Sequence, residues 1–200
     1  MCPMDPDRKA ELFAAALPIF NRFGYRKTTI EEICREAGLS KRTFYEEFDD
    51  KKDFFGRLVL HMATAFTLEW QEAVRDETSA AVQIERYIDQ YITSCQATPI
   101  FAVIFENDES MQAVDEAFND DSCKPMFAAL GAAIAMGSAS GEFRPVHAVK
   151  LTLIIGMMMD SLFCILPQLF KNSRIDADEA FVRELKAFVI NGLLARPSEG

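Results

Sequence analysis

Residues 28–48, TTIEEICREAGLSKRTFYEEF, decide the fold of the first part of this chain, because they contain two short helix patterns joined by a corner. Thr28 and Glu31 fit a capping box, in which both side chains accept hydrogen bonds from free N–H groups at the start of a helix. That helix closes at Gly38, which supplies a left-handed backbone angle, and Ser40 caps the next helix. The stretch therefore predicts two helices that meet at a sharp angle.

Helix signals continue on both sides of this stretch. Asp5 followed by Pro6 predicts the start of a first helix, whose apolar residues recur at helical spacing until Gly24 ends it. Pro18 lies inside this pattern and predicts either a kink or an early end. A long fourth helix is predicted to begin at Asp50. It would join the first three helices, which we call the head, to the remaining residues, which we call the body.

The middle of the chain also shows helical patterns. Ser79 opens a fifth helix that Pro99 ends, and a short apolar helix follows. The segment 109–137 predicts one helix that is disturbed near 119–125. The glycine- and serine-rich residues 137–141 predict a loop.

Two apolar helices complete the chain. The first spans residues 146–170, and the second spans 177–195 and opens with a capping box of Asp176 and Glu179. No stretch shows the alternation of a strand, so the sequence predicts an all-α fold of about nine helices. We expect residues 1–52 to form a head of three helices that contains this corner, and residues 53–200 to form a larger helical body.

Charge is distributed unevenly along the chain. The 200 residues carry a formal net charge of −10, yet residues 1–60 hold 11 basic and 11 acidic residues, so the acidic excess lies in the remainder. Half of the residues are hydrophobic, which is typical of a folded protein and excludes a disordered chain. A neutral head on an acidic body favours docking on DNA through specific cations, although an acidic body also simply confers solubility.

The start of the chain and its cysteines predict a cytoplasmic protein. The five cysteines form no C-x-x-C pair, so reduced thiols are predicted rather than a zinc site or a disulfide framework. The N-terminus has neither the basic start nor the apolar run of a secretory signal. Residues 151–170 have the length of a membrane span, but Asp160 at their centre and Pro167 favour a helix that is buried in protein.

The second helix of the corner carries the residues that are expected to contact DNA. Lys41, Arg42, Thr43 and Tyr45 lie at the front of a short, capped helix, which is an arrangement that fits a major groove. Arg42 can pair bidentately with a guanine edge, while hydroxyl and ammonium groups contact phosphates. On these residues alone, an ordinary helical corner with a solvated face is an equally good interpretation.

The complete pattern is more specific than these charges. Residues 20–51 read F-x2-F-G-Y-x2-T-T-I-x2-I-C-x2-A-G-L-S-K-x-T-F-Y-x2-F-x2-K, which resembles the DNA-binding head of the tetracycline-repressor (TetR) family. The resemblance implies a homodimeric transcriptional regulator, usually a repressor, whose last two helices form a four-helix dimer interface. It implies that residues 1–52 are a helix-turn-helix DNA-binding domain and that residues 53–200 are a ligand-binding and dimerisation domain. It implies DNA contacts from Thr28, Ser40, Lys41, Arg42, Thr43, Tyr45 and Lys51.

The sequence departs from the family pattern at two places. Arg42 stands where glycine is frequent, and Glu46 and Glu47 stand where histidines are common. Both departures leave the base preference open, because Glu46 can accept from a cytosine amine or point away from the groove.

The resemblance also implies that a small apolar effector binds the body and releases the dimer from a palindromic operator. Soft and aromatic residues are the candidates for its pocket, and plain core packing explains most of them equally well. They are Met62, Phe66, Trp70, Tyr91, Phe105, Met126, Met158 and Asp160. An acid such as Asp160 in an apolar helix needs a ligand, a proton or a hydrogen bond to a neighbouring helix.

Two other functions compete with a ligand-controlled regulator. An enzyme is not predicted, because the sequence has no H-E-x-x-H, E-x-x-H, G-x-S-x-G or phosphate-binding glycine loop. No cofactor or metal is predicted either, since neither of the two histidines has a metal-ligand neighbour. The remaining alternative is a DNA-binding protein of the same fold that answers to a protein partner or to no ligand.

Overall fold

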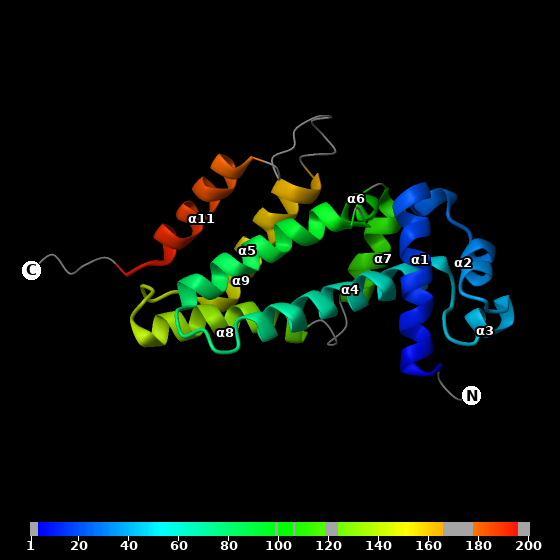
Figure 1. Ribbon diagram of the computed structural model, residues 1–200, viewed down its shortest axis with the longest axis horizontal. Helices are drawn as coiled ribbons and strands as arrows, with labels where there is room; N and C mark the ends of the chain where they lie inside the picture. The colour runs from blue at the N-terminus through cyan, green and yellow to red at the C-terminus, as the bar shows by residue number, and fades with distance from the viewer. Residues whose placement is uncertain (1–3, 99, 106, 119–123, 166–177, 196–200) are drawn as a thin grey trace, which may run out of the picture. The chain divides into compact units, whose positions relative to one another are not determined.

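The structure is a computed structural model that describes residues 4–98, 100–105, 107–118, 124–165 and 178–195. These residues form helices and connecting turns (Figure 1). They contain no strand, and their only β-type pairing is an isolated bridge between Phe143 and Leu194. The predicted all-α fold is therefore confirmed.

The chain divides into two compact units. Residues 1–62 and 98–121 form the first, and residues 63–97 and 122–200 form the second. The long helix α4 (Lys51–Ala73) contributes its first half to one unit and its second half to the other. The assignment of DNA binding to residues 1–52 and of ligand binding to the remainder stays a prediction.

The first helix, α1 (Pro6–Lys27), begins as predicted. Asp5 accepts a hydrogen bond from the backbone N–H of Asp7 at 3.0 Å, and Pro6 occupies the first helical position. The helix continues past Pro18, so the predicted early end at that residue is wrong; a proline removes one helical hydrogen bond without having to end the helix. The interruption comes at Gly24, whose φ of 75° is a conformation that glycine adopts readily.

Helix α2 (Ile30–Glu36) begins one residue later than predicted. Thr29, and not Thr28, is the N-cap: its hydroxyl accepts from the N–H of Glu32 at 3.3 Å, and Glu32 accepts from the N–H of Thr29 at 3.0 Å. Thr28 is only 1% exposed, and its hydroxyl donates to the carbonyl oxygen of Gly24 at 2.8 Å. The sequence TTIEE allows either register, and the burial of Thr28 selects the second.

An aromatic core holds the first unit together. Phe44 and Phe54 are fully buried with ring centroids 5.2 Å apart, and Phe48 packs on Phe54 at 4.9 Å. Burial of each ring contributes about 1.5–3 kcal/mol to folding. Phe44 lies on α3 (Lys41–Tyr45), Phe48 in the connection that follows it and Phe54 on α4, so this core holds α3 against the start of α4.

Two further helices, α6 (Ile100–Ile104) and α7 (Asp108–Phe118), belong to this first unit. Helix α6 packs against α1 and α7. On α4, a Cβ at Gly56 would lie 2.3 Å from the carbonyl oxygen of Ala113, so the close approach of α4 to α7 requires glycine at this position.

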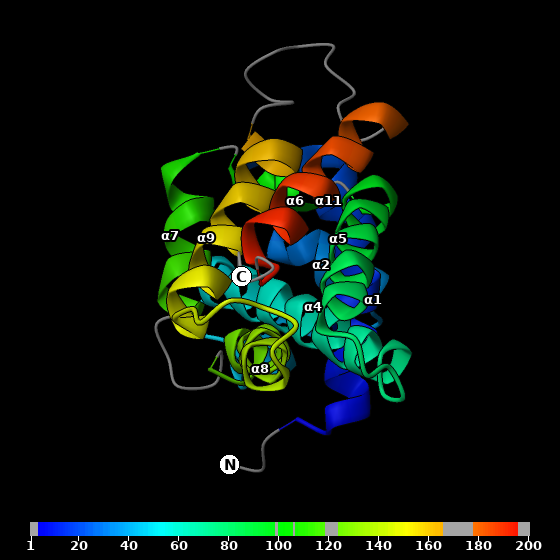
Figure 2. The same ribbon diagram turned by 90° about the vertical axis from the view of Figure 1, so that its left-hand side faces the viewer.

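The second unit combines the end of α4 with further helices. They are α5 (Ala80–Ala97), α8 (Lys124–Ser140), α9 (Ala148–Asp160), the π-helical turn η2 (Ser161–Ile165) and α11 (Glu179–Leu193). Helix α8 packs against α5 and α9, and α11 packs against α5 (Figure 2).

Helix α8 extends through most of the residues that were predicted as a loop. Residues 137–141 carry turn-type residues, but the helix continues to Ser140 and the turn comes at Gly141, with a φ of 81°. Gly137 is explained by packing, because a Cβ there would lie 2.3 Å from the ring of Phe143. A glycine inside a helical pattern here marks a close contact and not a chain reversal.

Other predicted boundaries also change. The segment 109–137, predicted as one helix that is disturbed near 119–125, contains two described helices: α7 ends at Phe118 and α8 begins at Lys124. The last helix is capped by Asp178, which accepts from the N–H groups of Ala180 and Phe181 at 2.9 and 3.1 Å, whereas the predicted cap Asp176 lies outside the described residues. No described helix is both long and apolar enough to cross a membrane.

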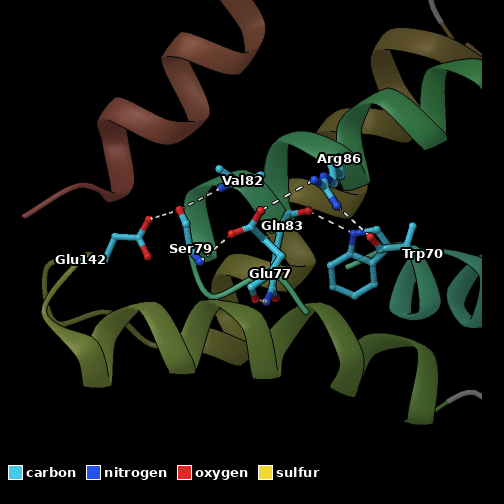
Figure 3. Close-up of polar contacts among 8 residues, drawn as sticks. Trp70, Glu77, Ser79, Val82, Gln83, Arg86 and Glu142 are labelled. Carbon is cyan, nitrogen blue, oxygen red and sulfur yellow. Dashed lines mark hydrogen bonds and ion pairs between the residues drawn. The ribbon is translucent and has the colours of Figure 1, made fainter. Parts of the chain in front are cut away.

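A polar network closes the corner between α4 and α5 (Figure 3). Glu142 caps the start of α5: it accepts from the hydroxyl of Ser79 at 2.6 Å and from the N–H groups of Ala80 and Ala81 at 2.7 and 3.0 Å. Partial burial alone would raise the pKa of Glu142, but these three hydrogen bonds outweigh it and hold that pKa below its ordinary value of 4.5.

Glu142→Gln is expected to lower the free energy of unfolding by about 1–2 kcal/mol at neutral pH, because the variant loses the charge at the start of α5. Because the pKa of Glu142 is lower in the folded state than in the unfolded state, its ionised form stabilises the fold at pH values above the unfolded-state pKa. This stabilisation is lost as the pH falls through the folded-state pKa. The difference between wild type and variant should therefore shrink as the pH falls below 4.5. Urea unfolding at several pH values measures it, with the exposed Glu69→Gln as a neutral control.

Candidate nucleic-acid interface

The corner between α2 and α3 (Lys41–Tyr45) is held by backbone hydrogen bonds and by buried apolar residues. The N–H of Leu39 donates to the carbonyl oxygen of Cys34 at 2.8 Å, and Gly38 adopts a φ of 63°, as predicted for the corner. Cys34 is buried where the two short helices meet, together with Ile33. The corner is therefore a rigid element that fixes the direction of α3.

Helix α3 is short, capped and exposed along one face. Ser40 caps it by accepting from the N–H of Thr43 at 3.0 Å, and the hydroxyl groups of these two residues lie 2.9 Å apart. The side chain of Arg42 is 89% exposed and that of Lys41 is 51% exposed. Tyr45 is 53% exposed, which is unusual for a large aromatic residue. The structure thus brings five of the seven predicted DNA-contacting residues together on one short helix and its cap.

Each cation of α3 is paired with an acid. Arg42 Nε donates to Glu46 at 3.0 Å, one helical turn away, and Lys41 forms an ion pair with Glu31 of α2. Exposed pairs of this kind contribute only about 0–1 kcal/mol, so a phosphate or a base can displace the acid. The pairing of Lys41 with Glu31 was not predicted, because no local pattern connects residues on two different helices.

The two glutamates that depart from the family pattern lie in different environments. Glu46 is exposed and pairs with Arg42. The side chain of Glu47 is only 10% exposed; it pairs with Lys9 and accepts from the N–H of Met4 at 2.9 Å. Partial burial would raise the pKa of Glu47, but the hydrogen bonds from Lys9 and Met4 outweigh it and lower that pKa. Glu47 thus anchors the start of the chain, and Glu46 stands beside the exposed face.

The two remaining predicted DNA contacts, Thr28 and Lys51, lie at the junction of α1, α2 and α4. The Lys51 ammonium donates to the carbonyl oxygens of Tyr25 and Thr28 at 3.0 and 3.3 Å and lies 4.3 Å from the centre of the Tyr25 ring. Tyr25 in turn donates its hydroxyl to Glu109 of α7 at 3.0 Å. These contacts give Lys51 a structural role in holding the turn before α2, whatever it contacts in a complex.

The predicted effector residues fall into two groups. Phe66, Trp70, Tyr91 and Asp160 belong to the second unit, where Tyr91 donates a hydrogen bond to Asp160. The ring of Phe66 lies 6.1 Å from that of Tyr91, and Trp70 donates to the carbonyl oxygen of Gln83 at 3.0 Å.

The other predicted effector residues have different surroundings. Met62 and Phe105 pack against the aromatic core of the first unit instead. Met158 is half-buried on α9, and the side chain of Met126 lies outside the described residues. Two further aromatic residues, Tyr87 and Phe163, have ring centroids 6.3 Å from that of Tyr91.

The comparisons agree with the geometry of the head. Residues 12–58 match the family described as "Bacterial regulatory proteins, tetR family". Over 149 residues the chain is 26% identical to the uncharacterized HTH-type transcriptional regulator YfiR of Bacillus subtilis (strain 168), covering 70% of each protein.

Solved structures share the fold over almost the whole chain. The transcriptional regulator FadR of Bacillus subtilis, solved in complex with stearoyl-CoA, matches with a TM-score of 0.71 at 18% identity, covering 92% of this chain and 98% of that one. The fatty acid degradation regulator FadR of Bacillus halodurans matches with a TM-score of 0.75 at 16% identity, covering 96% and 100%. Residues 12–58 therefore match the tetR family of bacterial regulatory proteins, and the chain shares the all-helical fold of these solved regulators.

Proposed function

We propose that the protein is a homodimeric repressor that binds a palindromic operator through α3 and leaves it when a small apolar effector binds the second unit. The observation that carries this proposal is the exposed face of α3, where Lys41, Arg42 and Tyr45 stand out from a corner fixed by a buried core. A short helix that is rigidly held and carries exposed cations matches the requirements of major-groove recognition.

Exposed apolar side chains on the last helices support dimerisation. On α9, Met157 is 70% exposed, Val149 64% and Ile154 57%; on α11, Phe188 is 73% exposed. A soluble protein rarely leaves several large apolar residues exposed on two helices unless another surface covers them. We infer that a second copy covers them, which agrees with the four-helix interface implied for residues 146–170 and 177–195.

A two-fold dimer determines the form of the operator. The two copies of α3 enter successive major grooves only when they lie about 34–36 Å apart, so the two half-sites form an inverted repeat with a fixed spacing. An effector that changes this spacing weakens binding, and a coupling of about 1–3 kcal/mol is enough for control. The complex of FadR with stearoyl-CoA supports a body of this fold as a ligand-binding element.

Selection of operators from a random DNA library by the purified protein tests the proposal. We expect the selected sequences to share an inverted repeat, and fluorescence anisotropy to show that binding weakens steeply as the salt concentration rises. Selection of a single unrepeated half-site, or of no sequence at all, would contradict it. A reporter gene placed behind the selected operator then distinguishes repression from activation.

A further inference from the structure

In the second unit, an acid binds a tyrosine that belongs to a group of aromatic rings from three different helical elements. Asp160, the last residue of α9, accepts a hydrogen bond from the hydroxyl of Tyr91 on α5. The ring of Tyr91 lies 6.1 Å from Phe66 of α4 and 6.3 Å from both Tyr87 of α5 and Phe163 of η2. We refer to Asp160 and these four aromatic residues as the aromatic–acid cluster.

The carboxyl group of Asp160 accepts a hydrogen bond from a neutral group, the hydroxyl of Tyr91. Among the residues that the structure describes, no lysine or arginine forms an ion pair with it. Burial raises the pKa of Asp160, and the hydrogen bond from Tyr91 lowers it by less. An acid in such surroundings is most stable as an anion when a cation lies beside it.

The backbone at this point is also unusual. Helix α9 changes at Asp160 into the π-helical turn η2, which carries Phe163. π-helical turns are rare and occur frequently at functional sites, where they change the direction of side chains. This observation is independent of the charge and places the irregular turn directly beside the acid.

We propose that the aromatic–acid cluster binds an organic monocation, an ammonium group attached to an apolar body, and that such a compound is the effector. Faces of aromatic rings attract cations, with about 0.5–2 kcal/mol for each well-placed ring, and the carboxylate neutralises the charge. Tyr87 lies between Trp70 and Tyr91, with ring centroids at 5.6 and 6.3 Å, so the aromatic contacts extend from the cluster along α4 and α5. The inference rests on the proposed function and replaces its wholly apolar effector by one whose apolar body carries a positive charge.

Three compounds of nearly equal shape separate charge from size: phenyltrimethylammonium, neutral tert-butylbenzene and anionic benzenesulfonate. Titration calorimetry with the full chain is expected to show the tightest binding for phenyltrimethylammonium. Trp70 is the only tryptophan of the chain, and its contact with Tyr87 makes its fluorescence a second readout. Equal affinity for the cation and the neutral compound, tighter binding of benzenesulfonate, or no binding of the cation would overturn the proposal.

Two variants locate the site. Asp160→Asn is expected to weaken binding of phenyltrimethylammonium at least tenfold and to leave tert-butylbenzene unaffected, because shape is kept and charge is lost. Asp160→Glu keeps the charge and is expected to retain cation binding. If Asp160→Asn does not fold, the cation affinity of Asp160→Glu is compared with that of the wild type instead. An unchanged cation affinity in folded Asp160→Asn would refute the site.

Operator binding without ligand is measured on the same samples. A wild-type protein that binds its operator but not the cation disproves this inference alone. Failure to bind any operator disproves the proposed function instead. Release of the wild-type protein, but not of Asp160→Asn, from the operator by phenyltrimethylammonium is the result that we expect.

Discussion

Alanine in place of Lys41, Arg42 and Tyr45 is expected to reduce operator affinity by about a thousandfold or more, to the level of non-specific DNA. All three side chains are at least half exposed in the free protein, so their removal leaves the core of the first unit intact. A bidentate arginine contact contributes about 1–3 kcal/mol of discrimination, and a two-fold dimer loses every contact twice. Anisotropy with the selected operator measures the loss.

A matched control separates these contacts from a general effect of charge. Arg75→Ala with Arg86→Ala removes an equal number of positive charges from exposed sites of the second unit outside α9 and α11, where the side chains are 68% and 49% exposed. We expect this variant to bind the operator almost as the wild type does. Equal loss of affinity in both variants, or unreduced binding by the triple variant, would rule out docking through α3.

The salt dependence of binding assigns a role to the single residues. Lys41→Ala should lower the slope of log affinity against log salt by about one for each lost phosphate contact. Arg42→Ala should instead reduce discrimination between operator variants at one base pair of each half-site. The ion pairs of these residues with Glu31 and Glu46 contribute too little to obscure either effect.

Local signals in the sequence predicted the head well. Asp5, Ser40 and Asp50 stand at helix starts where a side chain binds a free N–H group, and the structure uses all three in this way. The error at Thr28 arose because two overlapping capping boxes are locally equivalent. Only the burial of Thr28 against α1 distinguishes them, and burial depends on tertiary packing that a local pattern does not contain.

Tertiary contacts explain the other differences. Gly137 looks like a loop residue in sequence, but it is required where α8 meets Phe143. The aromatic–acid cluster combines residues from α4, α5, α9 and η2, so no sequence interval could indicate that Tyr91 binds Asp160 while Met62 and Phe105 pack in the other unit. The only local signal of this site was the presence of the acidic residue Asp160 in an apolar segment. It indicated that Asp160 needs a partner, but it did not indicate that this partner is Tyr91.

Met157→Asp combined with Phe188→Asp is expected to convert the proposed dimer into a folded monomer and to weaken operator binding by at least a hundredfold. The two side chains are 70% and 73% exposed in the protomer, so an aspartate at either site costs the monomer little. In a two-fold interface each substitution occurs twice and buries a charge against an apolar surface, which is strongly unfavourable. Sedimentation velocity measures the mass, and circular dichroism measures the helix content.

The control for this variant is Leu68→Asp, which places the same charge at an exposed leucine of α4. Leu68 is 61% exposed and lies outside α9 and α11, so its replacement should leave both mass and operator affinity unchanged. A dimer that survives the double substitution would show that these helices do not form the interface. A monomer that still binds the full operator as tightly as wild type would show instead that one head suffices, and the inverted repeat would lose its physical basis.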